Sequence, residues 1–226
     1  MDAELKPVKI DDLRPIREIV FMELKKAIFD GRIKEGEHLV ENMIAEKMNV
    51  SRTPVREALR QLEAEGLVIN IPRRGAIVKG ITMKDAEEIY DLREVLEGLM
   101  VRLACQNRTE EDISRLNQIL VLMEKAVQEK KYNKYLELHK DYNDIILSSS
   151  KNKKLQLMME NIYEYLTSLR SVSLYSQDRR VLAIEEHRQI VNAIDKRNEV
   201  EAEKLARSHV KKAKKSFFDN LIEAND

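Results

Sequence analysis

The sequence has one cysteine, no excess of either charge and no long apolar run, and each absence excludes a class of protein. Cys105 alone cannot form an intrachain disulfide or a cysteine-based zinc cluster, which fits a reducing compartment. No apolar stretch approaches the roughly 18 residues that a membrane-spanning helix needs. The first residues also lack the basic start and apolar stretch of a secretory signal. We therefore expect a cytoplasmic protein with no membrane span.

Glycine and proline are missing from the rear of the chain. All six glycines and all four prolines lie within the first 98 of 226 residues. Because these residues interrupt helices, we expect tight turns in the front part and nearly continuous helix behind it. The length favours two domains of unequal size. We predict a mainly α protein with one domain at residues 1–80 and an all-helical domain at residues 81–226.

Apolar spacing predicts three helices in the front domain, at about residues 16–30, 40–48 and 53–65. The third begins with Pro54 in its first turn, where the missing N–H costs nothing, and Gly66 follows its end. The second and third helices are separated by a short turn. This spacing is typical of a helix-turn-helix.

A hairpin is predicted directly after the third helix. Residues 67–71 and 76–78 have strand patterns and flank Pro72, Arg73, Arg74 and Gly75, a connection of hairpin length. A helix-turn-helix followed by such a hairpin is a winged helix-turn-helix.

Behind Gly80 the apolar stripes predict an antiparallel helical bundle. Thr82 and Thr109 each begin a capping box with an aspartate three residues on. Three consecutive serines at residues 148–150 suggest a turn. The predicted helices cover residues 83–106, 110–130, 132–147, 153–174, 179–196 and 199–222.

The net charge of zero gives no overall support for nucleic-acid binding, but the charge is unevenly distributed. Residues 49–80 carry six basic and three acidic side chains. Arginine at the start of a recognition helix can pair with guanine in the major groove, and serine or threonine can reach bases or phosphates. Arginine at a wing tip can reach a phosphate or the minor groove. The candidate DNA-binding residues are Ser51, Arg52, Thr53 and Arg56 on the third helix, and Arg73, Arg74 and Gly75 in the wing.

Three of the four histidines are predicted to point into the bundle. His139, His187 and His209 each share a face with apolar residues on three different helices. A single inward histidine is usually a core residue, but three converging imidazoles are typical ligands of zinc or nickel. Arg93 lies at the edge of a buried stripe, so it either pairs with an internal acid such as Glu97 or receives a carboxylate ligand.

Residues 41–67, ENMIAEKMNVSRTPVREALRQLEAEGL, resemble the signature of the GntR family of bacterial transcription regulators. Residues 91–97, DLREVLE, and 186–194, EHRQIVNAI, are similar to the FCD effector domain of its FadR branch. The resemblance implies a homodimeric repressor that binds an inverted-repeat operator and senses a small carboxylate. It also implies that Arg52, Thr53 and Arg56 contact the operator. Asn42 stands where other members have an arginine.

The resemblance further implies a divalent metal on His139, His187 and His209. The family's usual fourth ligand is an aspartate, and Tyr135 occupies that position here. Water or the effector could complete the shell, or the histidines could bind the effector directly. Tyr135 and Arg93 are therefore the candidate effector-binding residues.

Two other functions compete with regulation. A metal-binding enzyme on a helical bundle would be expected to carry a Glu-x-x-His, a His-Glu-x-x-His or a Gly-rich phosphate loop, and the sequence has none of these. A purely oligomeric scaffold leaves the predicted recognition helix and wing unexplained. Binding to operator-length DNA separates a regulator from both alternatives.

Overall fold

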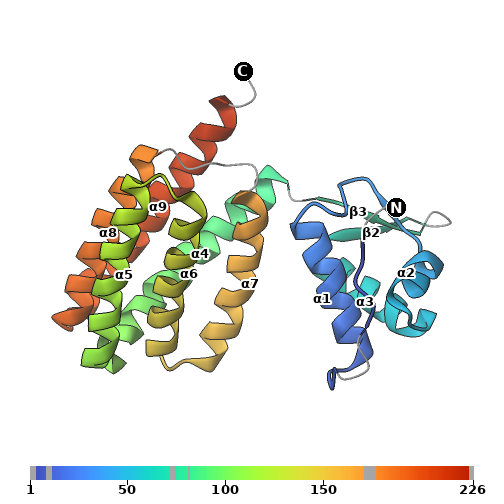
Figure 1. The fold of residues 1–226 in the computed structure, drawn as a ribbon, viewed down its shortest axis with the longest axis horizontal. Helices are drawn as coiled ribbons and strands as arrows, with labels where there is room; N and C mark the ends of the chain where they lie inside the picture. The colour runs from blue at the N-terminus through green and yellow to red at the C-terminus, as the bar shows by residue number, and fades with distance from the viewer. Residues whose placement is uncertain (1–3, 9–11, 72–74, 81, 171–176, 224–226) are drawn as a thin grey trace. The chain divides into compact units, whose positions relative to one another are not determined.

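Long helices make up most of the chain, as the scarcity of glycine and proline predicts (Figure 1). The computed structural model describes residues 4–8, 12–71, 75–80, 82–170 and 177–223. Its contacts divide the chain into two units, with the main boundary between Asp85 and Ala86. Each unit is described separately below.

The first unit holds three helices and a small sheet, which confirms the predicted winged helix-turn-helix. Its third helix packs against the first two helices and the second strand, and the buried side chains Leu24, Ile44 and Leu62 join the three helices in one core. The antiparallel sheet has the order β1-β3-β2. The elements are α1 (Ile16–Phe29), β1 (His38–Leu39), α2 (Glu41–Met48), α3 (Arg52–Ala64), β2 (Val68–Ile71) and β3 (Gly75–Val78).

The strand β1 is an addition to the sequence prediction. It pairs His38 with Ile77 and Leu39 with Ala76. Two residues are too few to show an alternating pattern, so periodicity could not reveal this strand. The strand β3 begins at Gly75, one residue earlier than predicted, and Pro72, Arg73 and Arg74 lie outside the described residues.

The second unit is a bundle of long helices (Figure 1). The helix α5 packs against α6 and α8, and α8 packs against α9. This arrangement confirms the predicted all-helical architecture. The elements are α4 (Met83–Asn107), α5 (Glu110–Gln128), α6 (Tyr132–Ser149), α7 (Lys153–Arg170), α8 (Gln177–Asp195) and α9 (Glu199–Glu223).

Both predicted capping boxes are present at helix starts. The backbone N–H of Asp112 donates to the Thr109 hydroxyl at 3.1 Å, and the Thr109 backbone N–H donates to the Asp112 carboxylate at 2.9 Å. Thr82 and Asp85 make the same reciprocal pair at 3.1 and 2.8 Å. These bonds satisfy N–H groups that the first turn of a helix leaves without partners.

One predicted helix end needs correction, and another falls outside the described residues. The helix α6 includes two of the three serines that were expected to form a turn, because the hydroxyls of Ser148 and Ser149 donate to the backbone carbonyl of Ile145 and are satisfied within the helix. The helix α7 is described as far as Arg170, and its predicted end at residue 174 falls in residues 171–176, which lie outside the described part of the chain.

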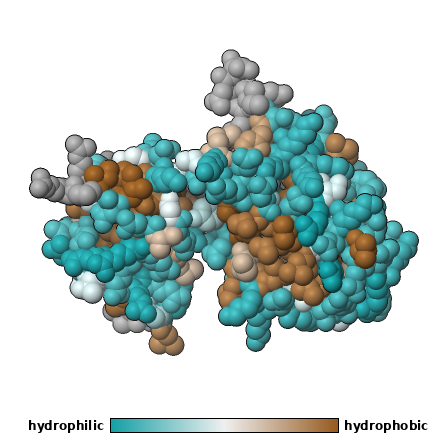
Figure 2. All heavy atoms as spheres, turned by 180° about the vertical axis from the view of Figure 1, so that it is seen from behind, coloured by the Kyte–Doolittle hydropathy of each residue, from teal (hydrophilic) through white to brown (hydrophobic). Residues whose placement is uncertain are grey.

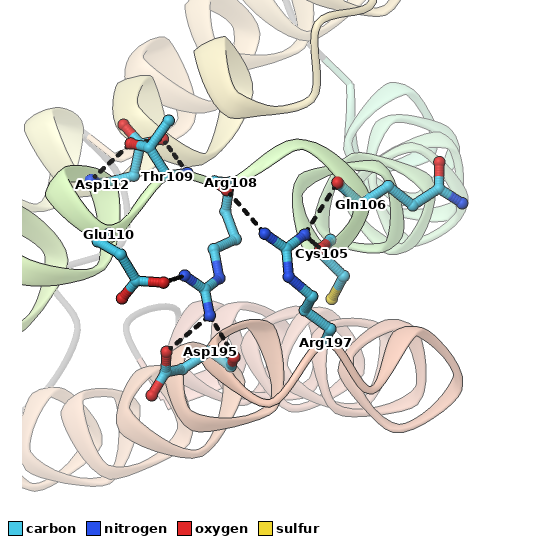
Figure 3. Close-up of polar contacts among 8 residues, drawn as sticks. All are labelled: Cys105, Gln106, Arg108, Thr109, Glu110, Asp112, Asp195 and Arg197. Atoms are coloured by element: carbon cyan, nitrogen blue, oxygen red, sulfur yellow. Dashed lines mark hydrogen bonds and ion pairs between the residues drawn. The ribbon is translucent and has the colours of Figure 1, made fainter.

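Two arginines join the α4–α5 turn to the α8–α9 turn (Figure 3). Arg197 donates to the backbone carbonyls of Cys105 and Gln106, both at 2.9 Å, and to that of Arg108 at 3.3 Å. Arg108 donates in return to the Asp195 carbonyl at 2.7 Å and to its carboxylate at 3.2 Å. Arg197 thus satisfies carbonyls at the C-terminus of α4, and Arg108 satisfies the carbonyl at the C-terminus of α8.

Candidate DNA-binding surface and buried histidine cluster

The start of α3 presents two arginines to solvent. Val55 and Leu59 are buried on the inner face of the helix, which turns the side chains of Arg52 and Arg56 outward. These side chains are 59% and 53% exposed. Ser51 precedes the helix in an extended conformation. The residues predicted to read DNA therefore occupy an accessible helix N-terminus.

A hollow of about 430 Å³ lies in front of these arginines. It is bordered by the starts of α2 and α3 and by the sheet. Gly75 belongs to it and has a φ of 80°, a left-handed conformation that favours glycine. The lining residues are Leu39, Val40, Glu41, Asn42, Arg52, Arg56, Leu59, Arg60, Glu63, Asn70, Gly75 and Ala76.

Glu41, which the sequence analysis did not single out, holds both arginines. Arg56 donates from Nε to Oε1 at 3.2 Å and from Nη2 to Oε2 at 3.3 Å. Arg52 donates from Nη2 to Oε2 at 3.2 Å. The hydrogen bond from Arg56, despite some desolvation and with help from Arg52, keeps the pKa of the Glu41 carboxyl below its ordinary value. The carboxylate is therefore ionised and shared.

The second unit brings the three predicted histidines together. The ring centroids of His139 and His187 are 5.2 Å apart, and those of His187 and His209 are 4.6 Å apart. The ring of Tyr142 lies 4.5 Å from His187, and Tyr135 stacks on His139 at 6.1 Å. All five side chains are buried. They come from α6, α8 and α9, as the spacing predicted.

His187 is the most enclosed member of this histidine cluster. Burial, followed by the charges of His209, His139 and Arg179, lowers its pKa well below the ordinary histidine value, so the ring is neutral. Its Nδ1 atom is buried and has no hydrogen-bond partner among the described residues. A buried polar atom of this kind marks a position where a bound ligand could supply the partner.

Glu186, next to His187 in sequence, was also missed. Its Oε2 accepts hydrogen bonds from Arg179 at 2.8 Å and from Nδ1 of His209 at 2.7 Å. Burial alone would raise the pKa of Glu186, but the hydrogen bonds and charges of His209 and Arg179 lower it to about 2. An ionised carboxylate can only accept, so Nδ1 of His209 donates the proton in this hydrogen bond.

Arg93 pairs with an internal acid, the first of the two alternatives that the sequence left open. Its Nε donates to Oε1 of Glu97 at 2.7 Å, and the two side chains are only 4% and 7% exposed. The hydroxyl of Tyr163 donates to the same oxygen at 3.4 Å. The guanidinium is therefore neutralised inside the bundle, as a buried charge requires.

The histidine cluster fits a metal ion only in part. Three imidazoles converge, and His187 offers an unpartnered nitrogen. Over the described residues, however, no group of three or more histidine, cysteine, aspartate or glutamate side chains is arranged to hold a metal ion. Tyr135 occupies the position at which a carboxylate ligand was expected. Tyrosine is a poor ligand when neutral, so the side chains as placed do not form a metal centre.

A winged helix-turn-helix with exposed arginines, followed by a helical unit with a buried polar cluster, is the arrangement of a ligand-responsive DNA-binding regulator. Residues 16–78 match the model of "Bacterial regulatory proteins, gntR family", and residues 88–212 match that of the "FCD domain". The chain belongs to the GntR family of transcription regulators and carries an FCD domain. Within the described residues, no helix has both the length and the apolar character needed to cross a membrane.

Individual relatives agree with the family. The chain is 31% identical over 202 residues to the uncharacterized HTH-type transcriptional regulator YdhC of Bacillus subtilis, covering 89% of this chain and 90% of that protein. It is 31% identical over 155 residues to the gluconate operon transcriptional repressor of the same organism, with 69% and 63% covered. In fold it resembles E. coli McbR/YncC, with a TM-score of 0.69, 20% identity and 92% and 99% covered. The two Bacillus subtilis relatives are named as a transcriptional regulator and a transcriptional repressor, so the alternative of an enzyme is not supported.

Proposed function

We propose that the protein is a repressor that binds an inverted-repeat operator as a homodimer and changes its DNA affinity when a small carboxylate enters the helical unit. The observation that carries the proposal is the pair of exposed arginines at the N-terminus of α3, set before a hollow between the helices and the wing. This is the part of a recognition helix that reaches base edges. The relative named as a repressor of the gluconate operon supports repression.

Selection from a random DNA pool tests the DNA-binding role. We expect the wild-type protein to enrich a palindromic sequence, and Arg52→Ala or Arg56→Ala to weaken binding to it by about 1 to 3 kcal/mol each. Arg188→Ala on α8 removes an equally charged, partly exposed arginine and should leave binding unchanged. Full operator affinity in both α3 variants would refute the assignment.

The homodimer is proposed because one short recognition helix makes too few base contacts for useful discrimination. Figure 2 shows a broad hydrophobic area on the helical unit, which suits a contact with a second copy. The exposed apolar side chains of that unit include Leu92 and Val95 on α4, and Leu157 and Met158 on α7. Sedimentation at micromolar concentration measures the assembly, and a monomer both with and without DNA would contradict the proposal.

The proposed effector site is the histidine cluster with Arg93 and Tyr135. A carboxylate there would meet cationic or proton-donating groups in a desolvated setting, where such contacts are strong. Thermal unfolding with a panel of small carboxylates, gluconate included, tests this because a ligand of the folded state raises the unfolding temperature. The paired variant Arg93→Met with Glu97→Met removes both buried charges and should abolish the rise. A rise that persists would place the ligand elsewhere.

The zinc or nickel ion on His139, His187 and His209 stays a prediction from the sequence. Its support is the convergence of the three rings and the unpartnered Nδ1 of His187. Metal analysis after incubation with zinc or nickel compares the wild type with a His187→Ala, His209→Ala variant. Equal metal content in the two proteins, or none in either, would eliminate the ion and leave the histidines as direct effector contacts.

A further inference from the structure

We propose that Glu41 is a positioning residue that determines how sharply the protein discriminates its operator from other DNA. The inference rests on the proposed role of Arg52 and Arg56 in operator binding. Glu41 lies in the first turn of α2, eleven positions before Arg52, and its carboxylate bridges both arginines.

The geometry leaves the reading edge of Arg56 open. Glu41 accepts from Nε and Nη2, which lie along one edge of the planar guanidinium. The opposite edge, formed by Nη1 and the second hydrogen of Nη2, remains for a two-bond contact with guanine O6 and N7. A guanidinium that is already held at one edge loses less conformational freedom when its other edge binds guanine, and this strengthens the specific contact.

The charge of Glu41 acts in the opposite direction on non-specific binding. Two neighbouring guanidiniums would attract any phosphate backbone, and this attraction supplies essentially all sequence-independent affinity. The shared carboxylate removes one unit of positive charge from that surface. The charge of Glu41 therefore weakens binding to every DNA sequence, whereas its hold on Arg56 strengthens the contact with the correct base. Specificity depends on the difference between the affinity for the operator and the affinity for other DNA.

The experiment uses full-length protein, a duplex that the wild type selects from a random pool, and a shuffled duplex of the same length and composition. Glu41→Gln keeps the side-chain shape and removes the charge. We expect tighter binding to the shuffled duplex, with a salt dependence steeper by about one unit per protomer, and a roughly tenfold lower ratio of selected to shuffled affinity. Glu41→Asp keeps the charge but shortens the bridge. It should bind the shuffled duplex as the wild type does and still lose discrimination.

Two controls separate positioning from general effects of charge and folding. Glu57→Gln removes another exposed carboxylate, on α3 itself, and should leave the affinity ratio unchanged. In an Arg56→Ala background, Glu41→Gln should change the ratio far less, because coupled residues are not additive. Thermal unfolding should be the same in all variants.

Three results overturn the inference: an unchanged ratio in Glu41→Gln, wild-type discrimination in Glu41→Asp, or an equal loss in Glu57→Gln. A wild-type protein that selects no sequence instead refutes the DNA-binding proposal itself, and the role of Glu41 with it.

Discussion

Replacing Arg197 tests how far the joined turns stabilise the helical unit. Arg197→Ala removes three hydrogen bonds to carbonyls at the end of α4 and just beyond it, of which the bond to Cys105 is partly buried and the others are exposed. A typical hydrogen bond contributes about 0.5 to 1.5 kcal/mol net, and exposed ones fall at the low end because water replaces them. The favourable position of a cation at a helix C-terminus adds about 0.3 kcal/mol or more.

The expected loss for Arg197→Ala is therefore about 2 kcal/mol, which corresponds to a fall of about 4 to 8 °C in unfolding temperature. Differential scanning calorimetry and urea titration measure it. Arg197 has a left-handed backbone with a φ of 53°. Alanine keeps that strain, so the loss reports the side chain alone.

Two matched variants test whether the loss of stability comes from these hydrogen bonds. Arg197→Lys keeps the charge but not the planar fork and should lose about half as much. Arg188→Ala removes an arginine whose ion pairs with Glu124 and Glu185 are exposed, and it should cost less than about 1 kcal/mol. If Arg197→Ala is no more destabilising than Arg188→Ala, water satisfies the α4 carbonyls and the reasoning fails.

Two further predictions concern the ends of α5. Lys130 has a φ of 56°, so Lys130→Gly should raise stability by about 0.5 to 1 kcal/mol in the same calorimetry, and a loss would show that its side chain contributes. Although burial opposes it, hydrogen bonding from Thr109 keeps the pKa of Asp112 below its ordinary value. Its stabilisation is therefore present above the unfolded pKa and lost as the pH falls through the folded one, so the roughly 1 kcal/mol deficit of Asp112→Asn should shrink in acid; a deficit independent of pH would contradict this.

Periodicity predicted the long helices because each buries a continuous apolar stripe. The same argument brought His139, His187 and His209 into one cluster, since a residue's place on a helix face is fixed by its spacing from apolar neighbours. The capping boxes at Thr82 and Thr109 could be predicted equally well, because the two residues of a capping box are only three positions apart in the sequence. Features that depend on a few neighbouring residues could therefore be predicted from the sequence.

Contacts between segments that are distant in the sequence could not be predicted in this way. Glu41 meets arginines 11 and 15 positions later, and Glu186 meets His209 across two helices. No periodic rule relates such positions, and a charged residue in a helix is usually a solvated one.

The left-handed residues in the turns without glycine could not be predicted, for a related reason. The helix α8 ends with Asn198 N–H donating to the Ala193 carbonyl and Arg197 N–H donating to that of Ile194, the pattern that glycine usually supports. Lys130 and Lys151 also have positive φ. At Arg197 the side-chain bonds to the end of α4 offset a local cost of about 1 kcal/mol or more, and no single-residue signal marks where that happens.

The carboxylates at the two candidate sites act alike but should respond differently to substitution. Glu41 and Glu97 each neutralise arginine, yet Glu41 is about a quarter exposed and Glu97 is almost fully buried. Removing Glu41 leaves guanidiniums that water can solvate, so binding changes and stability does not. Removing Glu97 alone takes an ion-pair partner from a guanidinium buried inside the bundle, which is strongly destabilising. A carboxylate effector bound at Arg93, as proposed above, would therefore replace Glu97 or share the guanidinium with it.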